Sequence, residues 1–131
     1  MQARVQRWFT KRLTGMTTLT YSERLQVLHL ESLVSRRRYF DLLQVCQIIR
    51  NPLFKGKLFV MQSDLSRFSL RGHDLAIHKQ RSLTGQRQRF FSNRVIDDWN
   101  NLPHHVISLV SQPNAFRTAL RNHTFCYLFD L

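Results

Sequence analysis

Apolar residues recur at helical spacing in the stretch from residue 88 to residue 103. Phe91, Val95, Trp99 and Leu102 follow one another at intervals of four, four and three, which places them on one face of a helix. Pro103 then ends the helix, because proline cannot donate a backbone hydrogen bond and restricts the residue before it. An indole is among the largest apolar groups, so we expect Trp99 to be the structural anchor of the local core, together with the other three.

The N-terminal stretch, residues 3–13, has the pattern of a basic amphipathic helix. Its apolar residues share one face, while its cations lie mostly off that face. The apolar set is Val5, Trp8, Phe9 and Leu13, and the cations are Arg4, Arg7, Lys11 and Arg12. Gly15 is a typical residue just beyond a helix end. This helix is the first of a small domain, so we expect its apolar face to pack into the core. A helix of this kind can also bind a membrane or nucleic acid.

Two further helices follow from capping signals. Thr20 and Glu23 have the spacing of a capping box, which predicts a short helix from that point. Ser32 or its neighbour is expected to start a longer helix that runs to Arg50 and stops at Asn51-Pro52. This longer helix contains Arg36, Arg37 and Arg38. Three consecutive residues spread around a helix, so at least one of these arginines is expected to lie with its stem buried along the apolar flank.

The remaining segments predict shorter elements. Residues 53–72 lack sustained helical spacing and predict a long connection. Residues 73–79 alternate weakly, which predicts a short strand, and Thr84-Gly85 offers a turn that would complete a two-stranded ribbon. Residues 104–110 are apolar on one side, and Ser111 is expected to cap a last helix. The fold class is therefore a single, mostly α domain spanning residues 1–131, with about five helices and a short β ribbon.

The excess of basic residues indicates what this chain binds. Twenty Lys and Arg residues stand against eight Asp and Glu residues, a formal net charge of +12. Such an excess predicts a polyanionic partner, and the predominance of Arg favours RNA or DNA, because guanidinium groups grip phosphates with paired donors. The predicted phosphate contacts are Arg36, Arg37 and Arg38, with Arg4, Arg7, Lys11 and Arg12 as a second cluster. A merely soluble basic surface is the alternative.

Other classes of function lack support in the residues. No apolar run approaches the roughly 20 residues that span a bilayer, and no secretory signal is apparent. Cys46 and Cys126 show no paired spacing, so we expect no disulfide framework and an intracellular, cytoplasmic or nuclear location. Asp97-Asp98 resembles a polymerase metal pair but lies in a helical pattern. No catalytic residue, metal site, cofactor or small-molecule substrate is predicted.

Several motifs together resemble a known family. They are VQRWFTKRLTGMTTLTYSERLQVLHLESLVSRRRYFDLLQV, LRGHDLAIHKQR, RFFSNRVIDDWNNLPHHVI and FRTAL, in this order. The series is similar to the C-terminal part of non-LTR retrotransposon reverse transcriptases, particularly the jockey-like group, and covers Val5 to Leu120. In that family these segments form the thumb and the region beyond it, while the catalytic aspartates lie upstream. Asp97-Asp98 does not match those aspartates.

The resemblance implies an accessory segment that contacts template, primer or element RNA and has no chemistry of its own. The chain departs from the family pattern in two places. Proline often stands where Thr14 is found, and acidic residues often stand at His104-His105. Two alternatives stay open beside this reading: a remnant of a degenerate element that is non-functional or binds protein, and a basic membrane-surface binder that uses the first helix.

Overall fold

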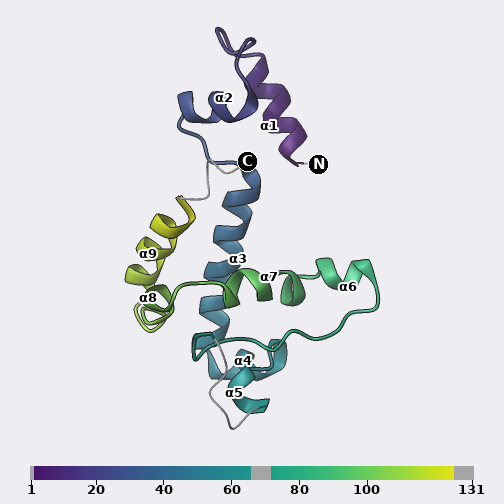
Figure 1. Cartoon of the computed structure of the whole chain (residues 1–131), viewed down its shortest axis with the longest axis vertical. Helices are drawn as coiled ribbons and strands as arrows, with labels where there is room; N and C mark the ends of the chain where they lie inside the picture. The colour runs from purple at the N-terminus through teal and green to yellow at the C-terminus, as the bar shows by residue number, and fades with distance from the viewer. Residues whose placement is uncertain (1, 66–71, 126–131) are drawn as a thin grey trace.

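The long helix α3 (Leu33–Arg50) runs through the centre of the molecule, and the other helices lie around it (Figure 1). The structure is a computed structural model that describes residues 2–65 and 72–125. This part of the chain is mostly helical, as predicted, but it contains nine helices where about five were expected. The others are α1 (Gln2–Lys11), α2 (Tyr21–Val27), α4 (Pro52–Leu58), α5 (Gln62–Leu65), α6 (Gly85–Arg89), α7 (Phe91–Asn100), α8 (His104–Ile107) and α9 (Pro113–Phe125).

Capping side chains set the two ends of α3, as the sequence predicts. The Ser32 hydroxyl accepts a hydrogen bond from the backbone N–H of Ser35 at 3.1 Å. At the other end Asn51 leaves the helical conformation, and its side chain accepts the N–H of Leu53 at 3.0 Å. Asn51 therefore ends α3 and caps α4, which begins with Pro52. The expected connection over residues 53–72 was wrong for its first part, where α4 and α5 lie, and residues 66–71 of it lie outside the described residues.

The core forms where α7 and α9 pack against α3. Trp99 is completely buried, and its indole N–H donates to the Leu75 carbonyl at 2.9 Å. Its ring lies 6.0 Å from that of Phe116 on α9. Val95 and Leu102 are also buried, whereas Phe91 is half-buried at the edge of the cluster. The helical spacing therefore identified the face of α7 that turns inward.

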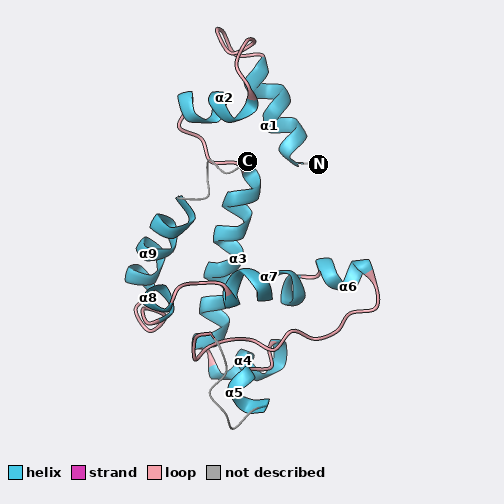
Figure 2. Cartoon of the chain, in the orientation of Figure 1, coloured by secondary structure: helices cyan, strands magenta, loops and turns pink. Residues whose placement is uncertain are grey.

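The predicted β ribbon is absent from the described residues, where Figure 2 shows no strand. A single antiparallel bridge joins Met61 to Ile77, and residues 85–89 form α6. The physical reason lies in Asn100, whose amide bonds both backbone groups of Ile77 at 2.8 Å. Residues 76–78 thus pair with residues 60–62 at this bridge, where the N–H groups of Gln62 and His78 donate to the carbonyls of Ala76 and Val60, while both backbone groups of Ile77 bond the side chain of Asn100.

The C-terminal elements match the sequence pattern apart from one cap. Val106, Ile107 and Val110 are buried, as their one-sided arrangement predicts. Helix α9 begins at Pro113, and the Gln112 carbonyl accepts the first helical hydrogen bond, from Phe116, at 2.9 Å. Ser111 is therefore not the cap residue. The predictions for the apolar tail after residue 125 and for Cys126 lie outside the described residues.

Helix α1 turns the opposite face inward from the one expected. The capping box of α2 is present, with Thr20 and Glu23 bonded reciprocally. On α1, however, the apolar side chains are exposed (Val5, Trp8 and Phe9), and the buried residue is Thr10. The cause is Arg24 of α2, which is buried and needs acceptors; its Nε donates to the Thr10 hydroxyl at 3.2 Å. The expectation that the apolar face enters the core was wrong.

Candidate nucleic-acid interface

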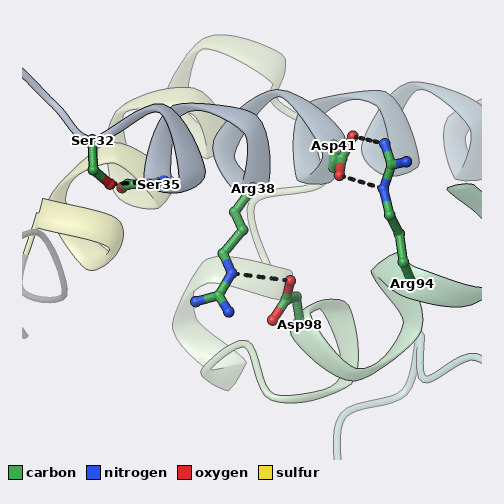
Figure 3. Close-up of polar contacts among 6 residues, drawn as sticks. All are labelled: Ser32, Ser35, Arg38, Asp41, Arg94 and Asp98. Carbon is green, nitrogen blue, oxygen red and sulfur yellow. Dashed lines mark hydrogen bonds and ion pairs between the residues drawn. The ribbon is translucent and has the colours of Figure 1, made fainter. Parts of the chain in front are cut away.

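The three consecutive arginines of α3 are all exposed, and they point in different directions. Arg38 lies 3.7 Å from the carboxylate of Asp98, whereas the Arg36 guanidinium lies 5.8 Å from the centre of the Phe40 ring (Figure 3 shows the first pair). Each of the three residues is exposed as a whole, and the burial of one stem stays a prediction. With about 3.6 residues per turn, alternate side chains leave nearly opposite sides of the helix. The three arginines therefore do not form one patch.

A second ion pair beside Arg38 fastens α7 to α3. Arg94 donates from Nε and from one terminal nitrogen to the two carboxylate oxygens of Asp41, at 3.0 and 2.9 Å (Figure 3). These hydrogen bonds raise the pKa of Arg94. Both side chains are partly buried, and they form a bidentate ion pair that links α7 to α3.

The adjacent carboxylates of α7 face separate cations. Asp97 is exposed and bonds Lys79, while Asp98 faces Arg38. Burial raises the pKa of Asp98, and the nearby Arg38 partly offsets this by lowering it. Within residues 2–65 and 72–125, no three His, Cys, Asp or Glu side chains are grouped to hold a metal ion.

An open groove lies between α7 and the loop before α6, with a volume of about 620 Å³. Its polar and charged lining consists of Lys79, Gln80, Arg81, Ser82, Gln88, Asn93, Arg94 and Asp97. We call these residues the basic groove. Two further exposed arginines, Arg87 and Arg89, flank the lining residue Gln88 on α6. Three cations, three amide side chains, one hydroxyl and the Asp97 carboxylate thus line one concave surface.

The basic groove was missed by the sequence reasoning. A signal was present, since Lys79, Arg81, Arg87, Arg89 and Arg94 occur in a stretch with no acidic residue, from residue 75 to residue 96. The cations are spaced irregularly there, so no helical pattern groups them. Only the packing of the loop, α6 and α7 brings them together.

The predicted cluster on α1 is exposed and partly held in place by aromatic rings. The Arg12 guanidinium lies 3.8 Å from the centre of the Trp8 ring, and that of Arg7 lies 4.7 Å from the Tyr21 ring. Burial raises the pKa of Tyr21, and the nearby Arg7 and Arg24 lower it. Arg4 and Lys11, the other members of the cluster, are also exposed.

Comparisons with protein-family models, curated proteins and solved structures found no match to this chain. The resemblance to reverse transcriptases therefore stays a prediction. Among the helices of the described residues, none is both long and apolar enough to cross a bilayer.

Proposed function

We propose that this chain binds RNA or DNA through the phosphate backbone, with the basic groove at the centre of the contact. The observation that carries the proposal is the convergence of Lys79 and Arg81 with amide side chains on one concave surface, beside Arg94, whose Nε and one terminal nitrogen are bonded to Asp41. Guanidinium groups offer paired donors to phosphate oxygens, and amides supply further donors to phosphate and sugar. The formal charge of +12 adds long-range attraction to any polyanion.

The ion pair between Lys79 and Asp97 does not block this function, whereas Arg94 stays paired with Asp41. The side chains of Lys79 and Asp97 are both more than half exposed, and an exposed pair of this kind contributes about 0–1 kcal/mol. A phosphate can therefore replace Asp97 as the partner of Lys79 at little cost. On α1 and α3, the described residues show no ion pair for Arg4, Arg7, Lys11, Arg12, Arg36 and Arg37. These six side chains extend the surface available to a phosphate chain.

The proposed biological role follows from the resemblance. We infer an accessory, non-catalytic segment of a retrotransposon-derived reverse transcriptase, in which the basic surface holds template, primer or element RNA. The separate partners of Asp97 and Asp98 support a role without metal chemistry at this pair. No feature favours recognition of particular bases, so binding is expected to depend little on sequence.

The basic groove can be tested with two variants that each remove two positive charges. Arg81→Gln/Arg89→Gln changes the groove and its flank, while Lys55→Gln/Lys57→Gln changes α4 and serves as the control. Fluorescence anisotropy at one low salt concentration should show a loss of nucleic-acid affinity of roughly ten-fold for the first and less than about three-fold for the second. Equal losses would contradict the groove as the binding site, and the absence of binding by the wild type would overturn the proposed function.

A further inference from the structure

Helix α1 presents an apolar face to solvent and a polar face to the rest of the chain. Val5 is 68% exposed, and Trp8 and Phe9 are each 57% exposed. On the opposite side, Gln6 accepts a hydrogen bond from the Tyr21 hydroxyl and donates to the Glu31 carbonyl at 3.0 Å. Large aromatic side chains are normally buried, so two exposed rings at consecutive positions of one helix indicate a surface suited to a partner.

The charge around this face identifies the chemistry of the partner. Arg12, just beyond the end of α1, lies 3.8 Å from the centre of the Trp8 ring, and Arg4 and Lys11 flank Trp8 on the helix. The first acidic residue of the chain is Glu23, and its carboxylate is engaged in the capping box of α2. The exposed face therefore combines aromatic rings with uncompensated positive charge, which complements a ligand that has both flat apolar groups and regularly spaced anions.

We propose that α1 binds single-stranded nucleic acid by stacking Trp8 and Phe9 against unpaired bases while its cations contact the phosphates. This inference rests on the proposed function and specifies its substrate class. In a duplex the base faces are covered by neighbouring bases, so only a single strand offers them to an exposed ring. Arg12 already stacks on Trp8 at 3.8 Å, which orients the indole and places a cation beside the base it would contact.

The test compares the full chain with three variants on a labelled oligothymidylate and on a duplex of the same length. Trp8→Ala should weaken single-strand binding by roughly 5- to 150-fold, the range expected for loss of one stacked base, and change duplex binding by less than about three-fold. Trp8→Phe should keep most of the affinity, since it keeps a ring. Phe54→Ala removes a 50% exposed ring from α4 and should leave both affinities unchanged.

Tryptophan fluorescence gives an independent readout. The chain has two tryptophans, and Trp99 is fully buried, so quenching by the single strand should come from Trp8 and disappear in Trp8→Ala. Equal effects of Trp8→Ala on single strand and duplex, or no effect, would overturn this inference and leave the proposed function standing. No binding of either nucleic acid by the wild type would overturn both. Binding to vesicles of phosphatidylserine and phosphatidylcholine that Trp8→Ala abolishes, with nucleic-acid binding unchanged, would overturn it in favour of a membrane surface.

Discussion

At the residue scale, the two tryptophans of the chain occupy opposite environments. Trp99 is fully buried, and its own polar groups are paired: its indole N–H donates to the Leu75 carbonyl, and its backbone carbonyl lies 3.0 Å from Nε2 of His73. Trp8 is 57% exposed and contacts Arg12. The same residue type thus stabilises the core at one position and is available for binding at the other.

Because Trp99 is buried and Trp8 is exposed, replacing each with alanine should change the free energy of unfolding by different amounts. Trp99→Ala should lower the free energy of unfolding by about 3 to 5 kcal/mol, because it leaves a large cavity and an unpaired Leu75 carbonyl. Trp8→Ala should change it by no more than about 0.5 kcal/mol, because the ring is mostly in water. Chemical denaturation of both variants measures this directly. A loss below about 1 kcal/mol for Trp99→Ala would contradict its role as the structural anchor.

Asp98 predicts a pH-dependent contribution to stability. Burial raises its pKa above the ordinary value of 3.8, so the folded state binds the proton more tightly than the unfolded state does. The stabilisation that protonated Asp98 gives to the folded state is therefore fully present below the ordinary pKa of 3.8. It is lost as the pH rises through the raised pKa of the folded state. At neutral pH, Asp98→Asn should be at least as stable as the wild type, and the difference should shrink as pH falls below about 4.

Asp41 supplies the control for this prediction, because its two carboxylate oxygens accept hydrogen bonds from Arg94 at 2.9 and 3.0 Å. Asp41→Asn should destabilise the chain at neutral pH, since it leaves Arg94 without its carboxylate partner. Denaturant unfolding across a pH series separates the two cases. An Asp98→Asn variant that is less stable than the wild type at neutral pH would mean that the attraction of Arg38 outweighs burial.

At the element scale, the caps of α2 and α3 were predicted correctly, whereas the exposed face of α1 was not. The caps at Thr20, Ser32 and Asn51 act within three residues of themselves, so the sequence alone predicts where α2 and α3 begin and where α3 ends. Helices α4 and α5 are too short to show sustained periodicity. The amphipathic pattern of α1 predicted a helix, but which face is covered depends on a buried arginine of α2, Arg24.

The arginines of α3 give a prediction at this scale. Replacing Arg36, Arg37 and Arg38 with Gln should weaken binding to all sequences and reduce the steepness of the salt dependence by about one to two units, at 0.7–0.9 per phosphate contact. Fewer than three contacts are expected because Arg38 faces Asp98 and the three side chains diverge. The matched control replaces Arg50, Lys55 and Lys57 at the other end of α3 and on α4. An unchanged salt dependence in the first variant would exclude a direct role for this cluster.

At the scale of the whole molecule, the sequence predicted the net charge and the basic clusters of α1 and α3, but it did not predict the basic groove. Net charge follows from composition alone, and the α1 and α3 cations stand out because each group is contiguous or periodic. The basic groove draws residues from a loop, α6 and α7, so it exists only after Asn100 binds the loop at Ile77 and Trp99 binds it at Leu75. The core and the proposed interface therefore share the same helix, α7.

The dependence of nucleic-acid affinity on salt concentration measures how many phosphates this chain contacts. Each phosphate that a cation neutralises releases counterions, so the logarithm of the association constant should fall linearly with the logarithm of the salt concentration. Fluorescence anisotropy of the wild type between about 50 and 200 mM salt should give a slope steeper than about −3, corresponding to roughly four or more phosphates, and similar values for unrelated sequences. A slope near zero, or no binding at the lowest salt concentration, would contradict the account.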